Sequence, residues 1–393
     1  MNANSPPTVP LLGVVLDSGP PVGSTDYTTI VVVHGLMWRG EGFQKLLPIS
    51  ARYNACTIAL ARRGYPGSAS YSEEEISVLK RLSTASPDSA ETTQEVDDFL
   101  KQQARELYDT LADFAKRENI PRVHEDKKGG IVVAGWSYGS RLMLAFLAHA
   151  HSFAPSHGAD LLTHLRRVIF YDSSFMAFGY PSPPGGSHPL HQSLNASASP
   201  TERLERFHAW VTGYYAHRRP RSPAAPSTEE TQEDGEGEGE GDEGFVFDGA
   251  VADSPLTTAE RAALVWEPPG REPDRSDTLV ARMSARSGAY ARMRRAVMFG
   301  GGREGGTDGS GLARARAEWW TRVEVRVVWC ERSIWPAVWG AMCVAREVEG
   351  AKGAGRAVRP VVIVRVRDAN HFAHWDYPER TIQAFLGDEE DVK

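Results

Sequence analysis

Short runs of mainly apolar residues recur along this chain of 393 residues, and most are followed by longer segments. The runs are rich in β-branched residues, as strands covered on both faces of a sheet are. Because such strands need helices on both sides, this pattern constrains the fold more than any other feature. The runs occupy residues 27–35, 54–68, 129–135, 166–172, 322–331 and 359–368.

Helical patterns lie between these runs. Within residues 89–119 the apolar side chains recur every three or four positions, which is typical of an amphipathic helix. Further helices are expected at residues 140–153 and 335–349, and a last helix begins near Pro378. Strands that alternate with helices through short loops form a mostly parallel sheet. The sequence therefore predicts an α/β fold with helices on both faces.

The alternation is interrupted between residues 173 and 320, which divides the chain into three parts. Residues 1–172 and 321–393 are expected to form the first and second parts of the α/β core. Helices are expected inside the insertion at residues 199–218 and 276–297. We interpret the insertion as a helical cap, or lid, over the carboxyl edge of the sheet. The alternative is a surface insertion with no role in the site.

Charge and cysteine content limit the classes of function. The formal net charge is −7, and much of it comes from an acidic, low-complexity segment at about residues 217–248, which is predicted to be disordered. No basic footprint points to a nucleic-acid partner. Cys56, Cys330 and Cys343 show neither a disulfide framework nor the spacing of metal ligands. We therefore expect no metal and no cofactor.

The distribution of apolar residues bears on location. No stretch is long and apolar enough to cross a bilayer, so no membrane span is expected. The first residues, "MNANSPPTVPLLGVV", lack the basic start and the long apolar core of a signal peptide. With cysteine usage that fits a reducing compartment, this predicts a cytoplasmic protein.

The segment "GGIVVAGWSYGSRLML" contains a candidate nucleophile, Ser137, in the pattern G-x-S-x-G. A predicted strand precedes the motif and a predicted helix follows it, which is the context of a nucleophile elbow. The small residues Gly135 and Gly139 allow the tight turn between strand and helix. The alternative is a serine that only caps the helix.

A nucleophilic serine needs a base and donors for the oxyanion. Among 12 histidines, His371 is favoured because it lies in a loop just after the last predicted strand and before the last helix, with His374 as its rival. One oxyanion donor is expected to be the backbone N–H of Tyr138. The other is expected to be that of Leu36, with Met37 as a further candidate, because they follow the strand that ends at "HG".

Together, "HG" after a strand, "RRGYPGS", "GWSYG" and "ANHFAHWDYPE" resemble the α/β-hydrolase superfamily, in particular the fungal-type branch of its first large family. The resemblance covers about residues 28–172 and 320–386. It implies an eight-stranded, mostly parallel sheet with Ser137 as nucleophile, His371 as base and a helical lid.

The acidic member of the site departs from the family pattern. The usual Asp follows the penultimate strand, but the nearest position in "VVWCERSIWP" holds Ser333. Asp172, at the end of the strand before the insertion, is the favoured substitute, and Glu331 is the alternative acid. Either carboxylate could accept the Nδ1–H of His371. A site without an acid is the third alternative.

These residues predict a serine hydrolase that forms an acyl-enzyme on Ser137. Its expected partner is a small-molecule acyl substrate, namely an ester, a thioester, a lactone or a similar compound. Two alternatives stay open, which are a non-catalytic ligand-binding member of the fold and an acyltransferase with the same triad. The sequence leaves the identity of the substrate and the oligomeric state undecided.

Overall fold

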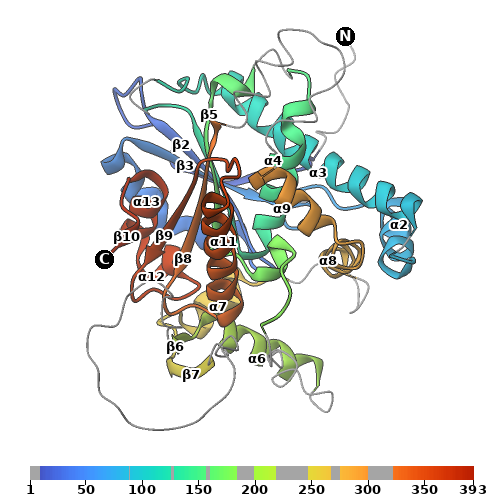
Figure 1. Ribbon diagram of the computed structural model, residues 1–393. Coiled ribbons are helices and arrows are strands. Elements are labelled where there is room, and N and C mark those ends of the chain that lie inside the picture. The colour runs from blue at the N-terminus through green and yellow to red at the C-terminus, as the bar shows by residue number, and fades with distance from the viewer. Residues whose placement is uncertain are drawn as a thin grey trace, which may run out of the picture.

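The computed structural model describes residues 9–87, 89–124, 128–155, 160–183, 199–217, 247–266, 275–299 and 322–393. An eight-stranded sheet runs through its centre (Figure 1), in the order β1-β3-β2-β4-β5-β8-β9-β10. β1 is antiparallel to β3, and the other neighbouring pairs are parallel. The predicted α/β fold is therefore confirmed. The strands are β1 (Gly13–Asp17), β2 (Thr28–Val33), β3 (Ala55–Ala61), β4 (Ile131–Trp136), β5 (Leu165–Tyr171), β8 (Glu324–Cys330), β9 (Val361–Val366) and β10 (Asp391–Val392).

Alternate side chains of each central strand face two separate hydrophobic cores, one on each side of the sheet. In β2, Val31 and Val33 join one core, whereas Ile30 and Val32 join the other. Helices α3, α4, α9 and α11 cover the first core, and α1, α12 and α13 cover the second. These helices are α1 (Leu47–Ser50), α3 (Ala90–Arg117), α4 (Ser140–His149), α9 (Ala289–Phe299), α11 (Trp335–Gly353), α12 (Ala373–Asp376) and α13 (Pro378–Leu386).

The helices expected in the core are present, and α3 shows why the sequence signal is clear. Its buried stripe includes Val96, Leu100 and Leu107, and the side chain of Ser89 caps its first turn by accepting the N–H of Thr92. A shorter helix, α2 (Glu73–Thr84), was not predicted from the sequence. A capping box precedes that helix as the pattern S-x-x-E, which was a readable signal.

The described part of the insertion differs from the expected helices in two places. The helix expected at residues 199–218 ends at Thr212, and β6 pairs antiparallel with β7 instead. The helix expected at 276–297 is two helices, because Gly288 turns the chain at a φ of +64°. The α-helices and strands described in the insertion before α9 are α6 (Pro200–Thr212), β6 (Tyr214–His217), β7 (Phe247–Ala252), α7 (Thr258–Leu264) and α8 (Ser276–Arg286).

Most of the segment predicted to be disordered, residues 217–248, lies outside the described residues. The residues at its two ends are described. His217 belongs to β6, while Phe247 and Asp248 belong to β7, and His217 pairs with Phe247. The disorder expected between these two ends remains a prediction.

The described elements of the insertion occupy two places. In Figure 1, α6, β6, β7 and α7 lie together beyond one end of the sheet, whereas α8 lies beside α2 and α9 beside α4. Met283 of α8 and Tyr290 of α9 are buried in the first core together with Met143 of α4. The insertion is therefore partly built into the helical layer.

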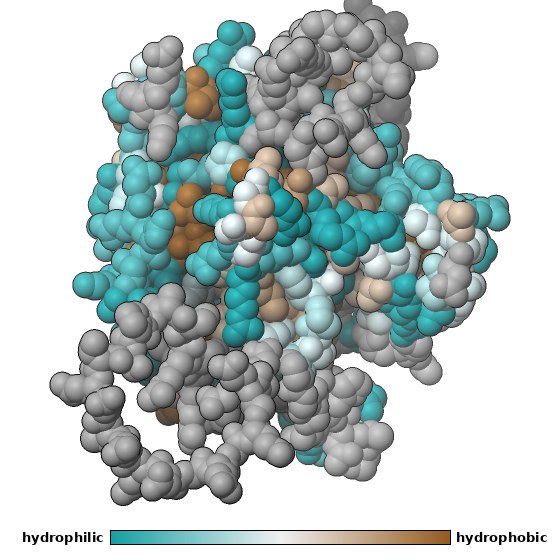
Figure 2. Space-filling model, in the orientation of Figure 1, coloured by the Kyte–Doolittle hydropathy of each residue, from teal (hydrophilic) through white to brown (hydrophobic). Residues whose placement is uncertain are grey.

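The surface shown in Figure 2 is mainly hydrophilic, with small, separate hydrophobic areas, as is usual for folded proteins. Among the described helices, none combines the length and the apolar character that a membrane crossing requires.

Candidate active site

The residues singled out from the sequence gather where parallel strands end. Ser137 directly follows β4, and Asp172 directly follows β5. His371 lies in the loop after β9, and β5, β8 and β9 are neighbours in the sheet. The carboxyl edge of a parallel sheet is where ligands bind in α/β folds.

Ser137 occupies a sharp turn between β4 and the helical segment that leads into α4. Its backbone has a φ of +52°, a left-handed conformation that is strained for any residue with a Cβ atom. A Cβ atom on Gly139 would lie 2.7 Å from the carbonyl oxygen of Val33, and one on Gly135 would lie 2.5 Å from the carbonyl oxygen of Gly139. The two glycines therefore let the turn pack closely against β2, as the nucleophile elbow predicted at this place would require.

Asp172 and His371 form a buried pair. Nδ1 of His371 lies 2.5 Å from Oδ2 of Asp172, and both side chains are at most 1% exposed. The other carboxylate oxygen, Oδ1, accepts the backbone N–H of Cys330 at 2.8 Å. The hydroxyl of Ser333 donates to Oδ2 and lies 3.3 Å from Nδ1 of His371. Asp172 is thus held on both oxygens and faces the imidazole.

The loop that carries His371 is fixed at two further points. The indole N–H of Trp136 donates to the carbonyl oxygen of His371 at 2.9 Å. The side-chain amide of Asn370 donates to the carbonyl oxygen of Thr212 at 2.8 Å, which ties the loop to α6 of the insertion. The position of the imidazole therefore depends on the core strand before Ser137 and on the insertion.

The alternative acid and the rival histidine lie elsewhere. Glu331 accepts the backbone N–H of Asp368 at 3.2 Å and lies 3.6 Å from the guanidinium of Arg365. His374 is fully buried, with its ring 4.6 Å from that of Trp136 between ring centroids. Burial holds the pKa of His374 well below its usual value. His374 is therefore a neutral core residue.

The three backbone donors considered for the oxyanion differ in their surroundings. The N–H of Met37 donates to the phenol oxygen of Tyr65 at 2.9 Å, so it is occupied. The N–H of Leu36 has no hydrogen-bond partner among the described residues. Tyr138 follows Ser137 in the first turn of the helical segment, where backbone N–H groups lack helical partners. Leu36 and Tyr138 remain the predicted donors.

His34, just before these donors, is structural. It is fully buried, and its Nε2 accepts the backbone N–H of Arg62 at 3.0 Å. Burial and the charge of Arg62 lower the pKa of His34 to about 3. The imidazole is therefore neutral in the folded protein at any pH at which the protein would be assayed.

This depressed pKa predicts acid sensitivity. Between the ordinary histidine pKa of about 6.5 and the folded value of about 3, the unfolded chain binds a proton at His34 that the folded chain does not. The free energy of unfolding then falls by roughly 1.4 kcal/mol for each unit of pH lost. Urea unfolding at pH 6.5 and 4.5 should show this loss in the wild type and a smaller loss in His34→Asn. Equal losses would contradict the assignment.

A model of the alpha/beta hydrolase family matches residues 30–384. The chain belongs to this family. The fungal-type branch expected from the sequence remains a prediction.

Solved structures add likenesses of low identity. A bromoperoxidase from Bacillus anthracis is similar at 12% identity and a TM-score of 0.46, over 95% of this chain and 94% of that chain. A thermophilic esterase from Thermogutta terrifontis is similar at 13% identity and a TM-score of 0.42, over 95% of this chain and 90% of that chain. A lipase-esterase related protein from Clostridium acetobutylicum is similar at 12% identity and a TM-score of 0.42, over 96% of this chain and 100% of that chain. No curated protein sequence matches the chain.

Two residues that shape the site of this α/β-hydrolase, Ser333 and Trp136, were not predicted from the sequence to do so. Ser333 was noted only as the residue at the position of the usual acid, although a hydroxyl there can donate to a carboxylate. Trp136, inside the motif itself, carried a readable hint, since a buried indole N–H needs an acceptor. No group of acidic, histidine or cysteine side chains among the described residues is arranged to hold a metal ion.

Proposed function

We propose that this α/β-hydrolase is a serine hydrolase that cleaves an ester, a thioester, a lactone or a similar acyl bond of a small molecule. The observation that carries the proposal is the buried contact between Asp172 and His371, at the sheet edge on which Ser137 occupies a strained turn. A carboxylate that accepts Nδ1–H fixes the imidazole tautomer in which Nε2 is free to take a proton.

The reaction then follows from these roles. Nε2 of His371 takes the hydroxyl proton of Ser137 while Oγ forms a bond to the substrate carbonyl carbon. The backbone N–H groups of Leu36 and Tyr138 stabilise the resulting oxyanion. The imidazolium, stabilised by Asp172, returns its proton to the leaving alcohol or thiol, and an acyl-enzyme remains. A water molecule, deprotonated by His371, then releases the acid and regenerates Ser137.

Labelling with a fluorophosphonate probe tests this proposal. The wild type should become covalently labelled, and Ser137→Ala should not. Ser152→Ala is the matched control, because Ser152 is an exposed serine beyond the end of α4 and should leave labelling unchanged. A folded wild type that resists the probe would contradict the hydrolase and would favour a ligand-binding member of the fold.

A screen of p-nitrophenyl esters of graded chain length, with thioesters and lactones beside them, would identify the acyl group. Adding acceptor alcohols or amines to the same assays separates hydrolysis from acyl transfer. Hydrolysis predicts free acid as the product at every acceptor concentration. An ester or amide of the acceptor as the main product would instead assign an acyltransferase.

A further inference from the structure

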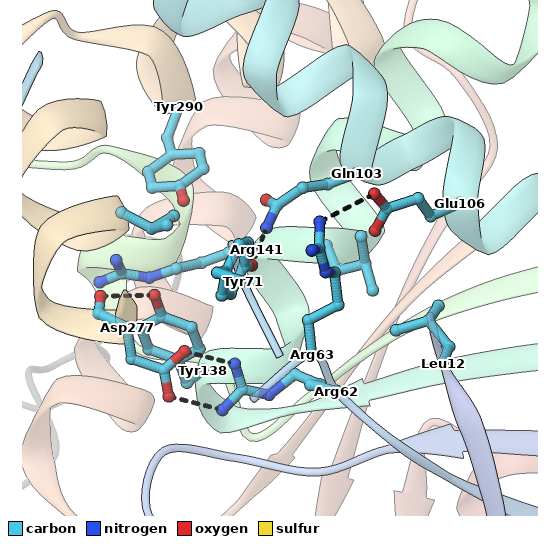
Figure 3. Close-up of a pocket in the computed structure, with 12 residues that line it drawn as sticks. Leu12, Arg62, Arg63, Tyr71, Gln103, Glu106, Tyr138, Arg141, Asp277 and Tyr290 are labelled. Atoms are coloured by element: carbon cyan, nitrogen blue, oxygen red, sulfur yellow. Dashed lines mark hydrogen bonds and ion pairs between the residues drawn. The ribbon is translucent and has the colours of Figure 1, made fainter. Parts of the chain in front are cut away.

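A buried ion pair joins the insertion to the core beside the candidate site. The guanidinium of Arg62, in the loop after β3, contacts both carboxylate oxygens of Asp277 at 2.7 and 2.8 Å. The side chain of Arg62 is 9% exposed and that of Asp277 is 7% exposed. Figure 3 shows the two groups facing each other, with Asp277 in the first turn of α8. A bidentate contact of this kind fixes orientation as well as distance.

Arg62 also holds the turn that leads to Leu36. Its Nε donates to the carbonyl oxygen of His34 and its Nη2 to that of Gly35, both at 3.1 Å. These are the two carbonyl groups that come just before Leu36. Because a peptide group is planar, fixing the carbonyl of Gly35 also fixes the direction of the N–H of Leu36. Asp277 therefore acts on Leu36 through the guanidinium of Arg62.

A second path runs through Tyr65. Its phenol donates to Oδ2 of Asp277 at 2.7 Å and accepts the N–H of Met37 at 2.9 Å. The phenol is buried and has one proton to donate, so Asp277 decides which way that proton points. The lone pairs of the oxygen are thereby left for Met37. This contact takes the Met37 amide out of competition and leaves Leu36 as the donor from this turn.

A third path leads to the other predicted oxyanion donor. The phenol of Tyr138 donates to the backbone carbonyl oxygen of Asp277 at 2.7 Å (Figure 3). The ring of Tyr138 also lies against the guanidinium groups of Arg62 and Arg141, at 4.7 and 4.5 Å from the ring centre. The residue after the nucleophile is thus attached to the same turn of α8 as the Leu36 loop.

We propose that Asp277 is a positioning residue for the oxyanion hole, which it holds through Arg62, Tyr65 and Tyr138. This inference rests on the proposed function, since it assigns a task to the insertion in that same reaction. An oxyanion hole works only when its donors are fixed before the charge develops. Here one residue of the insertion connects the two backbone segments that supply the donors.

Asp277→Asn tests the proposal by removing the charge while keeping the size of the side chain. Arg62 would then be buried without a counter-charge, and its hold on the carbonyl groups of His34 and Gly35 would weaken. We expect kcat for the best ester to fall by about 10- to 100-fold, with KM changed by less than about threefold. KM is expected to hold because ground-state binding does not use the oxyanion donors.

A transition-state analogue separates positioning from general damage to the fold. A trifluoromethyl ketone adds to the serine and places an oxyanion in the hole, whereas the matching methyl ketone does not add appreciably. In Asp277→Asn the inhibition constant of the trifluoromethyl ketone should rise by the same factor by which kcat/KM falls. Binding of the methyl ketone should change by less than about threefold.

Glu347→Gln is the matched control. Glu347 of α11 pairs with Arg294 of α9 at 2.9 Å, so it also joins the core to the insertion, but without a contact to the Leu36 turn. The Glu347→Gln substitution should lower the melting temperature. It should leave kcat and the inhibition constant of the trifluoromethyl ketone within about twofold of the wild-type values. If Asp277→Asn does not fold, Tyr65→Phe is the second variant, because it removes one of the three paths. It should lower kcat and raise the inhibition constant of the trifluoromethyl ketone in the same way, but by a smaller factor.

The outcomes are distinct for the two proposals. Suppose the wild type is active, and the folded Asp277→Asn and Tyr65→Phe variants keep kcat and analogue binding within twofold of the wild-type values. This result would overturn the role of Asp277 and would leave the proposed function standing. An equal loss in Glu347→Gln would also overturn it, because the effect would then be general. A wild type without labelling or turnover would overturn the proposed function and this role together.

Discussion

Ser137→Ala should reduce kcat for the best ester by about 10⁶-fold, which is the size of loss that follows removal of a triad serine. The physical reason is that no acyl-enzyme can form once Oγ is absent, while the donors of the oxyanion hole retain a small residual rate. Single-turnover and steady-state assays with a p-nitrophenyl ester measure the loss. Residual activity within tenfold of the wild type would contradict Ser137 as the nucleophile.

Ser137→Gly adds a control that the backbone provides. At a φ of +52°, Ser137 carries strain that glycine would not. The variant should therefore be as inactive as Ser137→Ala but more stable than it, by about 1 kcal/mol in the free energy of unfolding. Urea denaturation of both variants gives the comparison. A gain in stability together with a complete loss of activity would show that strain is maintained here for the chemistry.

Asp172→Asn should reduce kcat by about 10⁴-fold, because an amide at this place favours the wrong imidazole tautomer while the geometry stays intact. Asp172 is buried against His371, with its other oxygen held by the backbone of Cys330. The amide cannot accept on both sides as the carboxylate does. Steady-state kinetics on the same ester, with circular dichroism to verify folding, measure the effect.

Glu331→Gln is the matched control for the acid. It makes the same chemical change in the turn after β8, where Glu331 lies near Arg365 and Asp368. Its kcat should stay within about twofold of the wild type. The reverse ranking of the two variants would assign the acid to Glu331, and two small effects would leave the site without a catalytic acid.

The strands and the tight turn at Ser137 were readable from sequence because their signals are local. Burial on both faces of the sheet demands a nearly continuous apolar run, and the runs around β2, β3 and β4 show it. The turn at Ser137 needs small residues at fixed offsets, and Gly135 and Gly139 stand there. Errors arose where a short-range pattern was ambiguous, as at Gly288, where one helical pattern spans two helices.

The acid was undecided from sequence because distance along the chain says nothing about strand order. Glu331 and Ser333 lie about forty residues before His371, and Asp172 lies about two hundred before it. The structure places β8 between β5 and β9, so the ends of all three strands meet at one edge. At that edge Asp172 faces the imidazole, the smaller Ser333 lies beside it, and Glu331 points to Arg365 instead.

Sequence by itself therefore determined the α/β architecture and marked Ser137 and His371 as candidates, because burial periodicity and turn chemistry act over a few residues. Only the tertiary structure decided which carboxylate meets His371 and that Asp277 reaches the loop before Leu36. Both contacts join residues about two hundred positions apart. Such contacts depend on the order of strands in the sheet and on the packing of α8, which no local pattern encodes.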